Sequence, residues 1–162
     1  MTKNDFLAAV KDDLRETPLL YYVSGYKYQS RNAMIYQTFI YPEQDIITEL
    51  IVLRRDGWMW VAAFFSWDGC SGIAIDTDTN MRGGHAHDAL AALMRMGRLP
   101  IECRFKSNDL IRRLMIDDGA WGFRARGYEW TLDKMKFWAE PEHARKMKVA
   151  PHNIKMADGC PA

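Results

Sequence analysis

The sequence has few cysteines and no long hydrophobic run, and these absences exclude several classes of protein. Its three cysteines, Cys70, Cys103 and Cys160, lie far apart and match no zinc-binding spacing. An odd cysteine count also argues against an extracellular disulfide framework. No apolar stretch reaches the roughly 18 residues of a transmembrane helix, and the first residues lack the apolar core of a signal peptide. We therefore expect a protein of the cytoplasm.

The chain also lacks an excess of charge of either sign. Its 162 residues carry a formal net charge of +1, so the composition does not favour nucleic-acid binding, and none is expected. The chain is long enough to bury one hydrophobic core without disulfides or metals. We expect a single globular domain over residues 1–140, followed by a basic, flexible tail over residues 141–162.

The order of the patterned segments predicts an α+β fold. Thr2 and Asp5 give a capping-box-like start to a first helix, and Asp56-Gly57 is typical of a hairpin turn. We expect a small antiparallel sheet in the first half of the chain and three helices packed beside it in the second half. The expected strands are Leu19–Lys27, Ala33–Tyr41, Ile46–Arg54 and Trp58–Trp67, and the expected helices are Thr2–Arg15, Met81–Met96, Asn108–Asp118 (capped by Ser107) and Ala120–Glu140.

Four polar residues could together form a hydrolytic site. His87 and Asp88 are adjacent, so on a helix their side chains diverge by about 100°, and one can face a substrate while the other reaches a cation. Asp68, on the preceding loop, could be a second oxygen ligand for calcium. Asp109 lies near the start of the next helix, where its carboxylate could hold the His87 ring in one tautomer. Spacing alone leaves simpler explanations open: a turn at Asp68, a solvated Asp88 and a structural His87.

Five separated motifs resemble an uncharacterised family that is common in tailed phages and prophages. They are FSWDGCSGIAIDT, MRGGHAHDAL, LMRMGRLP, FKSNDLI and KMKFWA, and the similarity covers roughly residues 22–139, which is most of the fold. The family's pattern is W-D-G-x-S-G-P-x-x-D-T, M-R-x-x-x-x-H-D-A-L-Y and L-M-R-x-G-x-L-P, followed by an Asp in the next helix and a V-R-x-F-G-like segment. This resemblance implies a phage- or prophage-encoded protein that resides in the host cytoplasm or in the virion. Ile73 and Ala91 depart from the family's Pro and Tyr.

A more distant resemblance is to the small calcium-dependent phospholipases A₂ of bacteria and fungi. Their D-x-C-[ST] loop, helical H-D pair and following Asp look like Asp68-Gly69-Cys70-Ser71, His87-Asp88 and Asp109. The resemblance implies a phospholipase A₂-like helical core with His87 as general base and Asp109 orienting it. Asp68, Asp88 and the Gly69 carbonyl would bind calcium. Gly84 stands where those enzymes have the disulfide partner of the loop cysteine, so Cys70 is expected to be a free, buried thiol.

The other polar and aromatic candidates have simpler explanations. Asp76 and Asp78 alternate like calcium ligands but are expected to cap the following helix, and His85 is expected at the surface. The aromatic residues of the third long helix are expected in the core. Four arginines are expected on a solvated face, although anionic lipid headgroups would also suit them: Arg112, Arg113, Arg124 and Arg126.

Two functions from different classes follow from these patterns. The first is a calcium-dependent hydrolase of lipids or other esters. The second is a non-catalytic phage virion or accessory protein that uses the same scaffold to bind phage or host proteins, an inhibitor of host defence included. A hydrogen bond between Asp109 and His87 favours the enzyme, and enclosure of His87 by apolar side chains favours the binding protein.

Overall fold

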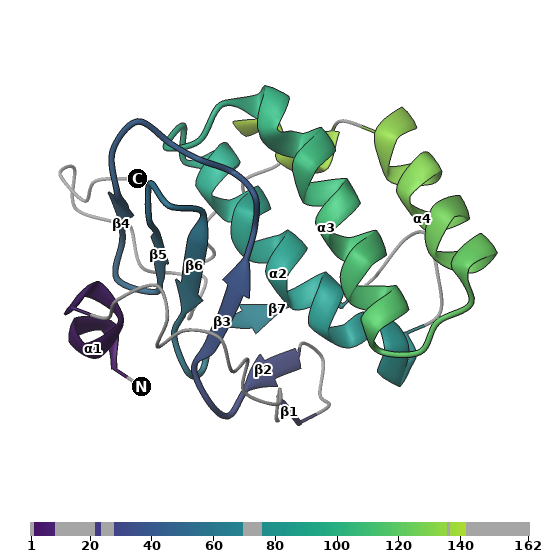
Figure 1. Ribbon diagram of the computed structural model, residues 1–162, viewed down its shortest axis with the longest axis horizontal. Helices are drawn as coiled ribbons and strands as arrows, with labels where there is room; N and C mark the ends of the chain where they lie inside the picture. The colour runs from purple at the N-terminus through teal and green to yellow at the C-terminus, as the bar shows by residue number, and fades with distance from the viewer. Residues whose placement is uncertain (1, 9–21, 24–27, 70–75, 136, 142–162) are drawn as a thin grey trace, which may run out of the picture.

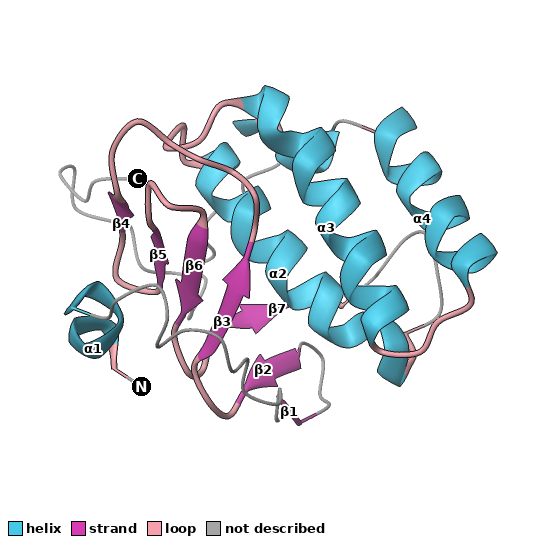
Figure 2. Ribbon diagram, in the orientation of Figure 1, coloured by secondary structure: helices cyan, strands magenta, loops and turns pink. Residues whose placement is uncertain are grey.

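The computed structural model describes residues 2–8, 22–23, 28–69, 76–135 and 137–141 of the chain. These residues form the α+β arrangement predicted from the sequence, with antiparallel strands in the first half and helices in the second (Figures 1 and 2). Apart from Pro141, the expected tail lies outside the described residues. So do Cys70, Ser71 and Ile73.

The strands form two sheets, so the prediction of a single sheet was wrong. The predicted strand Trp58–Trp67 breaks at Phe64, whose φ of 66° is not an extended conformation, and the chain changes sheet there. The predicted strand Ile46–Arg54 folds back on itself, with the Thr48 N–H donating to the Ile51 carbonyl. The four-stranded sheet has the order β3 (Met34–Gln37), β6 (Trp58–Val61), β5 (Ile51–Leu53), β4 (Ile46–Ile47), and the three-stranded sheet has the order β1 (Tyr22–Val23), β2 (Tyr28–Ser30), β7 (Ser66–Trp67).

The two faces of the four-stranded sheet bury different partners, as the alternation of side chains along a strand requires. Ile35, Val52 and Trp60 contact Phe6 of the short helix α1 (Lys3–Ala8) on one face. On the other face, the alternate residues Met34, Tyr36, Ile51, Leu53, Met59 and Val61 pack against the helical layer. Thr2 and Asp5 exchange the expected hydrogen bonds at the start of α1, at 2.8 and 3.1 Å, which confirms the capping box.

Three helices form a layer in which α3 lies between α2 and α4, and α4 occupies the outer edge of the molecule (Figure 1). Gly97 and Gly119 follow the C-caps of α2 and α3 and have positive φ, the conformation in which glycine commonly ends a helix. None of the described helices is long and apolar enough to cross a bilayer. The helices are α2 (Asp78–Arg95), α3 (Arg104–Asp117) and α4 (Gly122–Lys134), with short 3₁₀ turns η2 (Ile101–Cys103) and η3 (Phe137–Ala139).

Two predicted helix starts were wrong. Thr77 is the N-cap of α2, and its backbone N–H donates to the Asn80 side chain at 2.9 Å, so neither Asp76 nor Asp78 holds the cap position. Ser107 lies inside α3, because the 3₁₀ turn before it allows the helix to begin at Arg104.

Candidate functional site

His87 lies on α2 between α3 and the η3 turn, where it joins a chain of polar side chains. Its Nε2 is 3.1 Å from Oδ1 of Asn108 on α3, and the Asn108 amide nitrogen donates to the Asp133 carboxylate on α4 at 2.7 Å. The ring of Trp138 covers His87, with 4.1 Å between the ring centroids. His87 is only 6% exposed, so this chain of polar side chains begins in the interior of the helical layer.

The Asn108 amide decides which nitrogen of neutral His87 carries the proton. Because the Asn108 nitrogen donates to Asp133, its oxygen is the group that faces His87, and a carbonyl oxygen can only accept. His87 therefore donates from Nε2, and Nδ1 keeps the lone pair. Nδ1 lies 3.7 Å from Oδ1 of Asp88, too far for a direct hydrogen bond but close enough to stabilise an imidazolium.

Asp88 connects His87 to the loop that follows β7. Its Oδ2 accepts a hydrogen bond from the backbone N–H of Asp68 at 3.2 Å, and its side chain is about a quarter exposed. The structure thus brings together three of the residues singled out from the sequence: Asp68, His87 and Asp88.

Asp109 does not take the position expected for it. Its carboxylate forms ion pairs with Arg112 and Arg113, the residues one helical turn further along α3. Burial raises the pKa of this carboxyl, but the hydrogen bonds from Arg113 and Arg112 outweigh that effect and hold the pKa below its ordinary value. Asn108, one position earlier, makes the contact with His87 that was expected of Asp109.

The hydrophobic periodicity of α3 contains the signal that identifies Asn108. The buried apolar residues of this helix are Leu110, Ile111, Leu114 and Met115. Position 108 precedes Ile111 by three and Met115 by seven residues, which places it on the buried face. Asp109 is rotated about 100° from it toward the surface. Asp133 and Trp138 have no such signal, because the contact of Asp133 with Asn108 and that of Trp138 with His87 depend on how α4 and η3 pack.

The oxygen ligands expected for calcium are near one another, but they do not form a ready site. Gly69 has a φ of 70°, and a Cβ added there would lie 2.6 Å from the Asp76 carboxylate, so Asp76 is close to the Asp68–Gly69 turn. The chemistry of these oxygens suits calcium. However, Asp88 directs one carboxylate oxygen at the Asp68 amide, and no group of three or more His, Cys, Asp or Glu side chains among the described residues could hold a metal ion.

His85 is buried, contrary to the expectation of a surface position. Its Nδ1 lies 2.8 Å from the Tyr36 hydroxyl, and the rings of Phe65 and Trp67 meet it edge to face. Burial lowers the pKa of His85 to about 3 and raises that of Tyr36, so both remain neutral at physiological pH. His85 therefore ties α2 to β3 and is not exposed to solvent.

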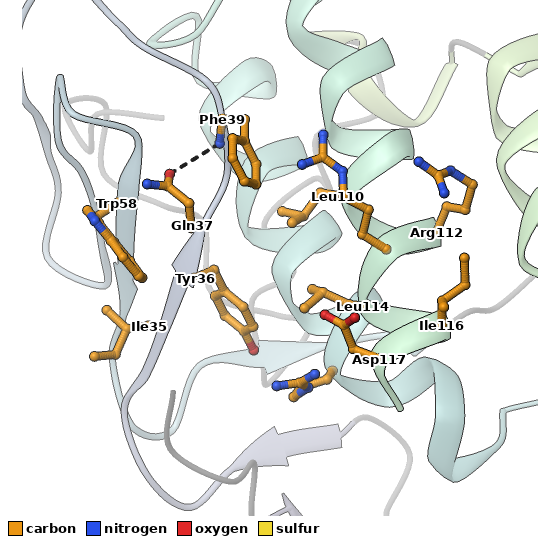
Figure 3. A pocket seen from close by; sticks show the side chains of 12 residues that line it. Ile35, Tyr36, Gln37, Phe39, Trp58, Leu110, Arg112, Leu114, Ile116 and Asp117 are labelled. Atoms are coloured by element: carbon orange, nitrogen blue, oxygen red, sulfur yellow. Dashed lines mark hydrogen bonds between the residues drawn. The ribbon is translucent and has the colours of Figure 1, made fainter. Parts of the chain in front are cut away.

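A pocket of about 490 Å³ lies between β3 and α3 (Figure 3). Tyr36, Leu110 and Leu114 contribute to its apolar wall, and Phe39 stands at its edge with the Arg113 guanidinium 4.2 Å above the ring. None of the four side chains expected to form a hydrolytic site lines this pocket. It is therefore separate from the His87 cluster.

No known protein family, curated protein or solved structure matches the chain.

Proposed function

We propose that this protein is a phage- or prophage-encoded hydrolase of lipids or other esters, with His87 as its general base. One observation carries the proposal. The Asn108 oxygen accepts from Nε2 of His87, which leaves Nδ1 as the nitrogen that can take a proton, and the Asp88 carboxylate lies 3.7 Å from that nitrogen. A neutral imidazole with one nitrogen anchored and the other beside a carboxylate is suited to general-base catalysis.

The proposed reaction needs no oxidant and consumes one water. Nδ1 of His87 removes a proton from water while the oxygen of that water attacks the ester carbonyl carbon. The imidazolium that forms is stabilised by Asp88, and it returns the proton to the departing alkoxide as the C–O bond breaks. Asn108 holds the ring throughout, and Asp133 holds Asn108.

Calcium is part of the proposal: Asp68, Asp88 and the Gly69 carbonyl would be its ligands, as the phospholipase A₂ resemblance implies. When bound, it would stabilise the negative oxygen of the tetrahedral intermediate. The proximity of Asp76 to Gly69 adds a candidate oxygen donor to that set. For cation binding, Asp88 would have to exchange its hydrogen bond to the Asp68 amide for the metal.

The test is a hydrolysis assay with short-chain and long-chain esters and with phospholipid vesicles, with calcium and with a chelator. We expect His87→Gln to abolish turnover without loss of folding, because glutamine can keep a polar contact with Asn108. Thr131→Ala is the control, because Thr131 lies on α4 and its hydroxyl donates to the Gly127 carbonyl. Absence of turnover by the wild-type protein on every ester, with and without calcium, would refute the proposal, and so would full activity of His87→Gln.

A second candidate is the non-catalytic phage virion or accessory protein. The covering of His87 by Trp138 favours it, because a substrate could not reach a ring that is 6% exposed without movement of η3. The pairing of Asp109 with Arg112 and Arg113, in place of the hydrogen bond to His87 expected of an enzyme, favours it as well. In that case the His87–Asn108–Asp133 chain is a structural connection between three helices. Loss of stability in His87→Gln, together with no turnover by the wild-type protein, would support this candidate.

A further inference from the structure

We infer that the outward face of α4 is a docking surface for an anionic lipid bilayer. Three large aromatic side chains stand out into solvent along this helix: Trp121 at its N-cap is 72% exposed, Phe123 74% and Trp130 63%. They were expected in the core, but the core positions of α4 are filled by Ala125, Tyr128 and Leu132 on the opposite side. Exposed aromatic residues on one face mark a surface that binds something apolar.

These aromatic residues recur with the period of a helix. Phe123, Trp130 and Lys134 are separated by seven and four residues, so they line up along one side of α4. Arg126 is exposed and lies beside them, and the Lys134 amine sits 5.8 Å from the Trp130 ring centroid. We call this set of residues, together with Trp121, the α4 outer face. Figure 1 shows α4 at the edge of the molecule, with α3 between α4 and α2.

The charge on the α4 outer face has one sign. The two acidic residues of the helix turn inward: Glu129 pairs with Arg112 of α3 at 3.1 Å, and Asp133 accepts the hydrogen bond from Asn108. The cations Arg126 and Lys134 therefore stand among the exposed rings without an acidic residue of α4 on the same face. Tryptophan and phenylalanine next to arginine and lysine suit the boundary between acyl chains and anionic headgroups.

Charge complementarity distinguishes this partner from others. A two-fold symmetric contact with a second copy would set Arg126 and Lys134 against the same residues of that copy, which like-charge repulsion disfavours. A nucleic acid would need a run of cations along its backbone, and here large aromatic residues outnumber cations on a single convex helix. An anionic bilayer satisfies both the apolar and the basic groups.

The experiment is sedimentation of the full-length protein with vesicles of phosphatidylcholine, alone or mixed with phosphatidylglycerol, at low and high salt. We expect binding to the mixed vesicles that weakens as salt rises. The double variant Phe123→Ser/Trp130→Ser should bind the mixed vesicles at least about tenfold more weakly than the wild type. The affinity of Arg126→Gln/Lys134→Gln for the anionic vesicles should be about thirtyfold lower than that of the wild type.

The matched control is Tyr41→Ser/Phe105→Ser. It removes two exposed aromatic residues elsewhere, each of which has a cation near its ring just as Trp130 has Lys134, and it should bind like the wild type. The inference is overturned by lack of vesicle binding, by equal loss in the control, or by tighter binding to a single-stranded oligonucleotide. A dimer that dissociates in Trp130→Ser also overturns it, because the face would then bind a second copy. His87→Gln should bind vesicles normally, so the test does not depend on the proposed hydrolase activity.

Discussion

Removal of the Asn108 side chain tests the polar chain that underlies the candidate site. Asn108 is fully buried and makes two hydrogen bonds, one to His87 and one to the Asp133 carboxylate. A bond between neutral groups contributes about 1 kcal/mol, and one to an ionised group about 1.5–3 kcal/mol. The better helix propensity of alanine returns about 0.5 kcal/mol. Asn108→Ala should therefore lower the free energy of unfolding by about 2–3.5 kcal/mol.

The neighbouring residue provides an internal control for this experiment. Ser107 is also buried on α3, but its hydroxyl has no hydrogen-bond partner among the described residues. Ser107→Ala removes an unsatisfied group and gains helix propensity, so it should be neutral or slightly stabilising. Urea unfolding of both variants measures the difference. If Asn108→Ala falls within about 0.5 kcal/mol of Ser107→Ala, the two hydrogen bonds are not holding the helices together. Nitrogen NMR of the His87 ring adds a direct reading: the Nε2–H form should dominate in the neutral wild type.

Two further predictions concern helix packing and pH. Gly83→Ala should destabilise the protein by about 1 kcal/mol, because the added Cβ would lie 2.7 Å from Ile111 Cγ1, and this overpacking outweighs the helix propensity gained. Gly127→Ala on α4 meets open space and should stabilise by about the same amount, so thermal unfolding that ranks the two variants the other way would contradict this. His85 has a pKa of about 3 when folded and about 6.5 when unfolded, so below pH 6.5 the unfolded chain binds a proton that the folded chain does not. As the pH is lowered from 6.5 to 3, the free energy of unfolding should fall by up to about 1.4 kcal/mol per pH unit. His85→Gln should lose this component of the pH dependence.

The candidate site could be predicted in part. His87 and Asp88 are neighbours on one helix, and the Asp68 loop comes directly before it, so short-range geometry brings them together. The partner of His87 on α3 was predicted to be Asp109, but it is Asn108, one residue earlier. Chemistry favoured the carboxylate, yet the periodicity of the buried apolar residues favoured the amide. In this case the packing pattern was the better guide, because a one-residue step turns a side chain about 100° around the helix.

The sequence by itself determined the α+β order, the capping box at Thr2 and Asp5, the hairpin at Asp56-Gly57 and the helix ends at Gly97 and Gly119. Each depends on the conformational preferences of a few adjacent residues, which can be read from a short stretch of sequence. The tertiary structure alone decided that strands split between two sheets, that Asp133 accepts from Asn108 while Trp138 covers His87, and that Phe123 and Trp130 of α4 face outward. Those outcomes depend on how segments that are distant in the sequence pack against one another. The identity of an apolar side chain does not indicate whether another segment will cover it.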